Sequence, residues 1–286
     1  MMILLTGATG KTGSETAKAL AARGVKARAL VRNAGKAAAL QAAGMELVVG
    51  DVTDADCVRK ALAGVSKLLL LLPNSEQQLA QEKQVVDLAR AAGVRHIVKM
   101  SSMEAVPGAS APIRQIHWES EQYLRASGLA WTMIRPDFFM DNFLGSAGTI
   151  REKKLFALPL GESRSAMIDA RDIGAVTAEA LAGQGHEGKS HDITGPELLS
   201  CHQVAECLSG VLGTTITYVA ADPQAYLGIL RRVLPNEWHA NAVSALFREI
   251  AEGVVPSRVT DTVRKVTGRG PFTLAQFLRE HIAAFR

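Results

Sequence analysis

The glycine-rich turn near the N-terminus constrains the fold of this chain more than any other segment. An apolar run over residues 2–5 leads directly into TGATGKTG at 6–13, and an alanine-rich helical pattern follows over 14–23. Glycines allow a tight turn and let the backbone approach a pyrophosphate, whose charge the free N–H groups of a helix start stabilise. The context predicts a dinucleotide-binding α/β domain, although the G-x-x-G-x-x-G spacing differs from the G-x-G-x-x-G fingerprint. The alternative is an ordinary strand-to-helix turn in another α/β protein.

Composition narrows the class of protein further. The chain has 286 residues, 48% of them hydrophobic and 21% charged, which is typical of a soluble globular protein with a substantial core. The net charge of +4 comes from scattered Lys and Arg residues, so we expect an anionic phosphorylated ligand and no nucleic acid. Three cysteines form no even framework, which favours reduced thiols in the cytoplasm. No apolar stretch reaches ~18 residues and no basic segment precedes the first one, so neither a membrane span nor a signal peptide is expected.

Strand-like and helix-like patterns alternate through the first half of the chain. After the first strand, strands are expected over 25–31, 46–49, 68–72, 96–100 and 130–134. The helices between them are expected over 34–43, from an N-cap at Thr53 to Gly64, from a capping box of Ser75 and Gln78 to Ala92, and over 113–126. Apolar strands separated by amphipathic helices predict a Rossmann-type, doubly wound parallel sheet that is covered on both faces.

The pattern loosens after Pro136. Short strands are expected over 165–168 and 191–194, with a helix over 170–182 between them, and residues 223–266 read as mostly helical. Capping boxes predict helix starts at Ser200, with Gln203, and at Thr273, with Gln276. We therefore expect an NADP(H)-binding Rossmann domain over 1–136. Residues 137–286 would add late strands and an irregular, mostly helical substrate lobe, and the whole would form one compact unit.

The charge at the end of the second strand indicates which dinucleotide is bound. Arg32 stands about 20 residues past the glycines, where an NAD-specific protein carries an acid for the ribose 2′-hydroxyl. Arg28 and Lys36 are the nearby charges, and a guanidinium favours a 2′-phosphate. We therefore predict NADP(H) over NAD(H). The alternative is an exposed arginine in an ordinary loop.

The other strand ends supply further candidates for cofactor contact. Asp51, after the third strand, could hydrogen-bond the adenine amino group or could merely cap the next helix. Loops at the carboxyl edge of the fourth and fifth strands would pack against the riboses and the nicotinamide. The predicted cofactor-binding residues are Gly7, Thr9, Gly10, Lys11, Thr12, Gly13, Arg32, Lys36, Asp51, Val52, Leu72, Pro73, Met100 and Ser101.

Several motifs together resemble the NmrA-like, atypical branch of the short-chain dehydrogenase/reductase superfamily. They are the glycine turn at 6–13, VRN at 31–33, GD at 50–51, AGVRHIV at 92–98, IRP at 134–136, FMDNF at 139–143 and IDARDI at 168–173. The similarity covers roughly the first two thirds of the chain. It implies a reductase that passes hydride directly from NAD(P)H to an electron-poor conjugated substrate without flavin. The implied acceptors are quinones, azo dyes and triphenylmethane dyes.

One departure separates this chain from ordinary short-chain dehydrogenases, which use a Tyr-x-x-x-Lys pair to shuttle a proton. None of the three tyrosines is followed by lysine at that spacing. The corresponding helix carries His117 and Glu121, one turn apart on a single face. His117 could donate a proton, or the two could form a structural pair near the pocket. His117 and Ser101 are the candidate catalytic residues.

The expected substrate pocket takes its apolar wall from the loop after the sixth strand. Its predicted residues are Met103, His117, Phe138, Phe139, Met140, Asn142 and Phe143, and the alternative for the aromatic members is core packing. His186, His191, Cys201 and His202 match no ligand spacing, so no metal is expected. The expected partner is a small aromatic or quinonoid substrate, and the chain would be a monomer or homodimer. A second possibility is a non-catalytic NADP(H)-sensing regulator that acts through protein partners.

Overall fold

Two compact units, each built from several stretches of chain, make up the protein. The computed structural model describes residues 2–254 and 257–286. The first unit comprises Met1–Pro107, Ile116–Arg135 and Ala170–Asp192. The second comprises Gly108–Gln115, Pro136–Asp169 and Ile193–Arg286. Along the described parts of the chain, no helix is both long and apolar enough to cross a membrane.

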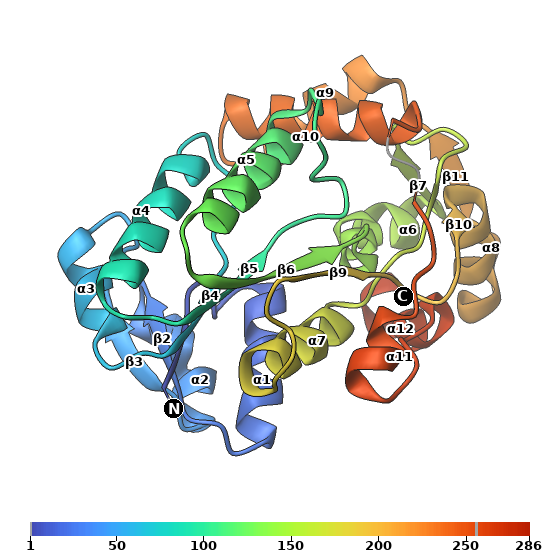
Figure 1. The fold of residues 1–286 in the computed structure, drawn as a ribbon. Coiled ribbons are helices and arrows are strands. Elements are labelled where there is room, and N and C mark those ends of the chain that lie inside the picture. The colour runs from blue at the N-terminus through green and yellow to red at the C-terminus, as the bar shows by residue number, and fades with distance from the viewer. Residues whose placement is uncertain (1, 255–256) are drawn as a thin grey trace. The chain divides into compact units, whose positions relative to one another are not determined.

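The first unit holds a central parallel sheet (Figure 1). Its strands are β1 (Ile3–Leu5), β2 (Ala27–Val31), β3 (Glu46–Val49), β4 (Lys67–Leu70), β5 (His96–Met100), β6 (Ala130–Pro136) and β9 (Lys189–Ile193). They are ordered β3-β2-β1-β4-β5-β6-β9, and the pairs from β3 through β6 are all parallel. This order reverses direction at β1, so the carboxyl ends of β1 and β4 flank the crevice where doubly wound sheets bind ligands. The predicted Rossmann-type fold is confirmed.

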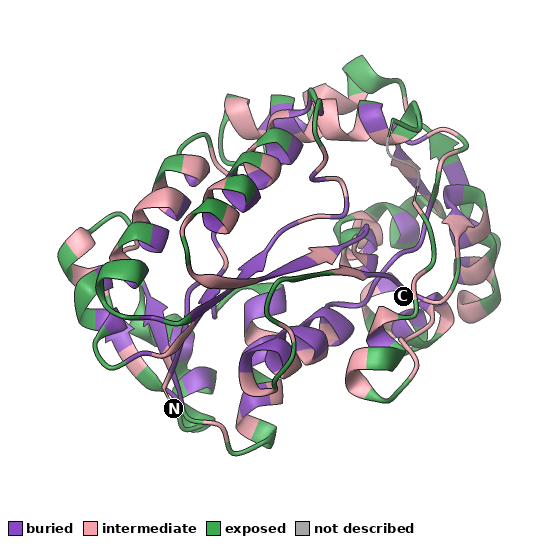
Figure 2. Cartoon of the chain, in the orientation of Figure 1, coloured by how far each residue is buried: buried purple, intermediate pink, exposed green. Residues whose placement is uncertain are grey.

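Helices cover both faces of this sheet. They are α1 (Lys11–Ala22), the short η1 (Ala34–Ala37) and α2 (Ala38–Ala42), α3 (Ala55–Leu62), α4 (Gln78–Ala91), α5 (Pro112–Ala126) and α7 (Ala170–Ala182). Figure 1 shows α3, α4 and α5 along one face and α1 and α7 along the other. The α1–α7 contact is close, because a β-carbon at Gly174 would lie 2.6 Å from the backbone carbon of Glu15. The inner strands β1, β2, β4, β5 and β6 are therefore buried along most of their length, as Figure 2 shows in purple, whereas the edge strands β3 and β9 are largely exposed or half-buried.

Two predicted helix starts are wrong, and the side chains involved show why. Helix α3 is capped by Asp54, which accepts from the N–H groups of Asp56 and Cys57, while Thr53 bonds Asp51 instead. Helix α4 begins at Gln78 after a helical turn and has no side-chain cap. The boxes at Ser200 and Thr273 are confirmed, each with both of its hydrogen bonds.

The second unit is mostly helical. Its elements are η2 (Met140–Ser146), α6 (Ala147–Lys153), β7 (Leu155–Leu158), β8 (Arg164–Ser165), β10 (Leu199–Ser200), α8 (Cys201–Leu212), β11 (Thr217–Ala220), α9 (Pro223–Val233), α10 (Glu237–Ala251), α11 (Thr262–Thr267), α12 (Leu274–Glu280) and α13 (Ile282–Phe285). Strands β7 and β11 pair in parallel, and β8 and β10 antiparallel. An aromatic core fills the unit, with Phe143 and Phe156 edge to face at 5.5 Å between ring centroids. The helical reading of 223–266 agrees with α9, α10 and α11, and residues 255–256 lie outside the described part.

The units are discontinuous for a physical reason. Helix α7 follows Pro136 by more than thirty residues along the chain, yet it belongs to the first unit because it packs on α1. Strand β9 likewise extends the sheet beyond β6. Both elements lie within residues 137–286, which the sequence predicts to add further strands to the sheet.

A buried histidine in the sheet makes stability depend on pH. His96 on β5 is 2% exposed, and its Nε2 lies 2.9 Å from the Thr132 hydroxyl, which itself donates to the His186 carbonyl. Burial first, and then the nearby Lys67 ammonium, lower the pKa of His96 to about 4. The unfolded chain takes up this proton near pH 6.5 and the folded chain does not. The stabilisation is therefore complete above pH 6.5 and is lost as the pH falls toward 4.

We expect His96 alone to remove about 2 kcal/mol of unfolding free energy between pH 7.5 and pH 5. Urea unfolding at both pH values measures this loss. In His96→Gln the drop should be smaller by about that amount, whereas His202→Gln, at an exposed histidine, should keep the wild-type drop. Equal drops in all three proteins would contradict the assignment.

Candidate active site

The glycine turn is held by backbone contacts that leave no room for side chains at two of its three glycines. Gly7 has a φ of +65°, and a β-carbon there would lie 2.6 Å from the Leu71 carbonyl oxygen. A β-carbon on Gly13 would lie only 2.1 Å from the Gly7 carbonyl oxygen. Both glycines are therefore required by the fold itself, because L side chains rarely adopt such a φ and cannot overlap the backbone.

Gly10 differs from Gly7 and Gly13. A β-carbon at Gly10 would meet only the Gly7 carbonyl oxygen, at 3.3 Å. The residue is exposed and its backbone is extended, with a φ of −81°. It is the N-cap of α1 and offers the first-turn N–H groups no side-chain acceptor. Thr9 and Lys11 on either side are exposed, whereas Thr12 is 6% exposed and packs inward. This helix start can accept an anion from outside the protein.

Arg32 and Asp51 come together at the carboxyl edge of β2 and β3. Arg32 is exposed and makes no hydrogen bond or ion pair within the described parts of the chain. Asp51 accepts from the N–H (2.9 Å) and the hydroxyl (2.8 Å) of Thr53. These hydrogen bonds lower the pKa of Asp51, and the Arg32 charge lowers it further. Asp51 therefore does not cap α3, which removes one of the two alternatives for this residue.

Arg28, which lies on β2 itself, has a structural role. Its guanidinium donates to Glu46 (2.8 Å) and to the carbonyls of Ala61 (2.6 Å) and Ala63 (2.8 Å). Lys36 is exposed on η1, beyond Arg32. Of the three predicted cations, Arg32 and Lys36 remain open to a ligand.

A threonine hydroxyl joins the ends of β1 and β4. The Thr6 Oγ1 accepts from the N–H of Leu71 (2.9 Å) and lies 3.0 Å from the carbonyl oxygen of Leu69. This bond ends β4 at Leu70, two residues before the predicted end. Leu72 beyond it is 7% exposed, Pro73 is exposed and Val52 of the neighbouring loop is half-buried.

Ser101, after β5, is engaged by a buried carboxylate. Its hydroxyl donates to Glu121 Oε1 at 2.6 Å, and the same oxygen accepts from Arg135 Nε at 2.8 Å. The bond to Glu121 raises the pKa of Arg135. Met100 and Met103 on either side of the turn are both at least nine-tenths buried. The hydrogen of the Ser101 hydroxyl is therefore already donated within the protein. The catalytic role of Ser101 remains a prediction.

His117 does not pair with Glu121, so the predicted structural pair is wrong. The His117 Nδ1 lies 3.5 Å from the ammonium of Lys99, on β5. Burial and the Lys99 charge hold the pKa of His117 well below its usual value. The imidazole is therefore neutral at pH 7, which argues against a histidinium as the proton donor.

Lys99 and Glu82 are the charged residues that sequence reasoning missed. Both side chains are fully buried, and they form an ion pair at 2.9 Å. Glu82 also accepts from Gln78 (3.0 Å) and from the Ser120 hydroxyl. The available signal was a lysine inside a strand predicted to be wholly buried, because a buried charge requires a partner.

The tyrosines lack the surroundings of a proton shuttle. Tyr123 donates to the Asp87 carboxylate, which raises the pKa of its hydroxyl. Burial raises the pKa of Tyr218 to about 12 and also raises that of Tyr226. None of the three is the lowered-pKa tyrosine that a Tyr–Lys pair provides.

The aromatic loop of the second unit divides into core and surface residues. Phe138, Met140 and Phe143 are at most 8% exposed and belong to the aromatic core. Phe139 is half-buried and Asn142 is exposed, and the Phe138 carbonyl accepts from the Ile168 N–H at 2.9 Å. Phe139 is thus the aromatic residue of this loop with surface available to a ligand. The pocket assignment itself remains a prediction.

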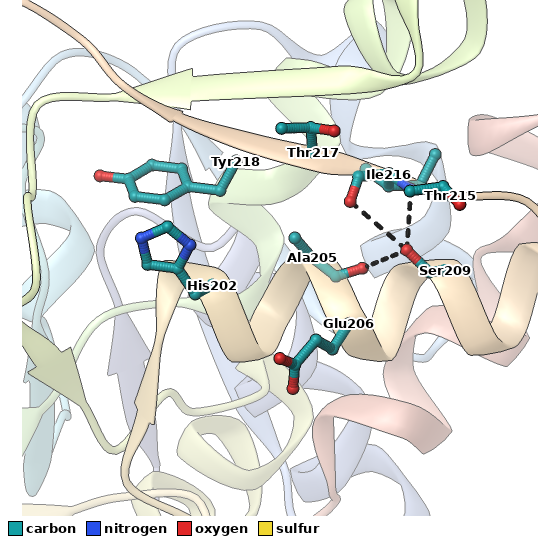
Figure 3. A pocket seen from close by; sticks show the side chains of 8 residues that line it. All are labelled: His202, Ala205, Glu206, Ser209, Thr215, Ile216, Thr217 and Tyr218. Atoms are coloured by element: carbon teal, nitrogen blue, oxygen red, sulfur yellow. Dashed lines mark hydrogen bonds between the residues drawn. The ribbon is translucent and has the colours of Figure 1, made fainter.

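A surface pocket in the second unit involves none of the predicted site residues. It has a volume of about 460 Å³ between α8 and β11 (Figure 3), and is lined by His202, Ala205, Glu206, Ser209, Thr215, Ile216, Thr217 and Tyr218. The Ser209 hydroxyl donates to the Ala205 carbonyl (2.7 Å) and accepts from the Ile216 N–H (2.8 Å), so this hydroxyl serves the local packing.

His186 and His191 lie side by side, with 3.0 Å between ring nitrogens, but no group of three potential metal ligands occurs among the described residues.

Comparison with known proteins decides the family. The model of the NmrA-like family matches residues 1–278. The chain belongs to the NmrA-like family. It is 39% identical to an NAD(P)H azoreductase of Xenophilus azovorans over 99% of both chains. The crystal structure of an NADPH-dependent quinone oxidoreductase of Escherichia coli with NADPH is 28% identical, covers 98% of this chain and all of its own, and has a TM-score of 0.89. A Citrobacter triphenylmethane reductase complexed with NADP(H) is 26% identical over 97% and 99% of the chains, with a TM-score of 0.85.

Gly10→Val tests whether the turn binds a dinucleotide. The new side chain would occupy the surface that a pyrophosphate must approach, while the contact at 3.3 Å costs the fold little. We expect NADPH to lose its effect on the thermal unfolding midpoint, with far-UV circular dichroism nearly unchanged. Gly13→Ala is the contrasting variant and should fail to fold, since its β-carbon overlaps the backbone. Normal stabilisation of Gly10→Val by NADPH would contradict the site.

Proposed function

We propose that this protein is a flavin-free, NADPH-dependent reductase of electron-poor conjugated substrates such as quinones, azo dyes or triphenylmethane dyes. The observation that carries the proposal is the open helix start at Gly10 after β1, together with the exposed Arg32 after the neighbouring strand β2, in a chain closely similar to an NAD(P)H azoreductase. The quinone and triphenylmethane reductases with bound nicotinamide cofactor support it further.

The residues at the carboxyl edge of the sheet fit a dinucleotide phosphate. The α1 start would hold the pyrophosphate, and Arg32, with Lys36 nearby, would hold the 2′-phosphate. Asp51 keeps its second carboxylate oxygen for the adenine amino group. When bound, the reduced nicotinamide supplies a hydride.

The chain itself would orient the substrate and exclude water. No tyrosine is placed to shuttle a proton, so carbonyl–alcohol chemistry of the usual kind loses support. Conjugated acceptors do not need such a residue, because water can protonate the reduced product. Phe139 is the apolar surface that we assign to substrate contact.

Exchange of Arg32 for aspartate tests the cofactor preference. Arg32→Asp should weaken NADPH binding by roughly 1.5–3 kcal/mol, as for a charge-assisted hydrogen bond, and should leave NADH binding unchanged. Calorimetric titration with both cofactors measures this difference. Lys26→Asp makes the same charge change at an exposed residue just before β2, at the opposite end of that strand, and should affect neither cofactor. Equal losses of both cofactors in Arg32→Asp would contradict the assignment.

Turnover with a panel of acceptors tests the reaction. Purified protein, shown by its absorbance to hold no flavin, should oxidise NADPH with at least one quinone, azo dye or triphenylmethane dye. Phe139→Ala should raise KM several-fold with little change in kcat, because apolar contact is lost equally in ground and transition states. Phe272→Ala, at another half-buried aromatic residue, is the control. Tight NADPH binding with no acceptor reduced would favour the NADP(H)-sensing regulator instead.

A further inference from the structure

The Lys99 ammonium has three acceptors around it, which is the number of hydrogens it can donate. They are Glu82 Oε2 at 2.9 Å, the carbonyl of Met100 at 2.9 Å and His117 Nδ1 at 3.5 Å. An ammonium has no lone pair, so the ring nitrogen that faces it must be the unprotonated one. The proton of the neutral His117 ring therefore sits on Nε2.

The Lys99 ammonium is itself fixed in place. Glu82 is 0% exposed and accepts from Gln78 and Ser120 as well as from Lys99, so both of its oxygens are bonded. Turning either partner toward water would leave the other charge buried and unpaired, which is strongly unfavourable. Lys99 must therefore keep facing His117.

The other side of the His117 ring is open. In the described parts of the chain no group accepts from His117 Nε2, although the residue is only 8% exposed. Its N–H thus remains available to a ligand, close to the end of β5, where Met100 and Ser101 are predicted cofactor contacts.

We propose that Lys99, held by Glu82, is a positioning residue that locks His117 in the Nε2–H tautomer. The neutral ring then presents one N–H to the oxygen or nitrogen of the acceptor on which negative charge builds during reduction. This proposal rests on the proposed function. A quinone or azo acceptor takes up one hydride, donated by the reduced nicotinamide, and water supplies one proton; a cationic triphenylmethane dye takes up the hydride alone and needs no such stabilisation. His117 keeps its own proton throughout and stabilises the charge as a hydrogen-bond donor, as neutral imidazoles do in other enzymes.

Nitrogen-15 NMR of the imidazole rings in the full chain tests the tautomer without cofactor or substrate. In the wild type at pH 7, His117 should show a protonated Nε2 and a pyridine-like Nδ1. Lys99→Met leaves Glu82 buried without its partner and could unfold, so the Lys99→Met/Glu82→Gln double variant removes both charges. In that variant, we expect a mixture of tautomers at His117.

The control is Lys67→Met, which removes a half-buried strand lysine that donates to the Gly183 carbonyl at 3.1 Å. It should leave the His117 signals as in the wild type. A wild-type His117 with the proton on Nδ1, or with both nitrogens protonated at pH 7, overturns the proposal. An unchanged tautomer in the double variant overturns the role of Lys99.

Turnover with a quinone tests the role of the N–H group. His117→Gln retains an N–H donor at a similar reach and should keep most of kcat, whereas His117→Phe should lower kcat by about tenfold with little change in KM. Equal kcat values for both variants overturn the donor role. If no acceptor on the panel is reduced, the proposed function fails, and the NMR result still decides the tautomer by itself.

Discussion

The backbone contact between Gly7 and Gly13 is the constraint on which the first unit depends. The carbonyl of Gly7 occupies the place where any other residue at 13 would carry its β-carbon, so the first turn of α1 lies directly on the turn after β1. The Thr6 hydroxyl then ties the same turn to the end of β4. These contacts hold together the carboxyl ends of β1 and β4, at the edge of the sheet where the predicted cofactor residues follow the strands. Gly10 takes no part in this close packing, so its surface faces outward.

Regular elements with strong periodicity could be predicted from the sequence, whereas only two of the four predicted helix caps were right. The strands over 46–49 and 96–100 and the helix over 170–182 have the predicted bounds. In the predicted box of Ser75 and Gln78, the Gln78 side chain instead lies inside the protein and its amide nitrogen donates to Glu82, one helical turn on. A capping pattern records only what nearby residues could do, and another partner within reach can take the same side chain.

The candidate site shows the same limit. Positions that follow from strand ends, such as Arg32 and Asp51, do meet at one edge, because parallel strands bring their carboxyl ends together. Contacts between side chains of different helices and strands could not be predicted from the sequence. Helical spacing suggested that His117 would contact Glu121, but each faces a different residue of the adjoining strand and turn, Lys99 and Ser101 respectively. One helical face can therefore serve two separate networks.

The discontinuity of the first unit has a consequence for biosynthesis. Helix α7 covers α1 closely enough that Gly174 has no room for a side chain, and β9 ends the sheet. A growing chain that has emerged only as far as β6 therefore exposes the apolar side of α1 and an unpaired strand edge. The sheet that bears the cofactor residues becomes complete only after Asp192 has left the ribosome, so the whole η2–β8 segment of the second unit is synthesised before the first unit can close.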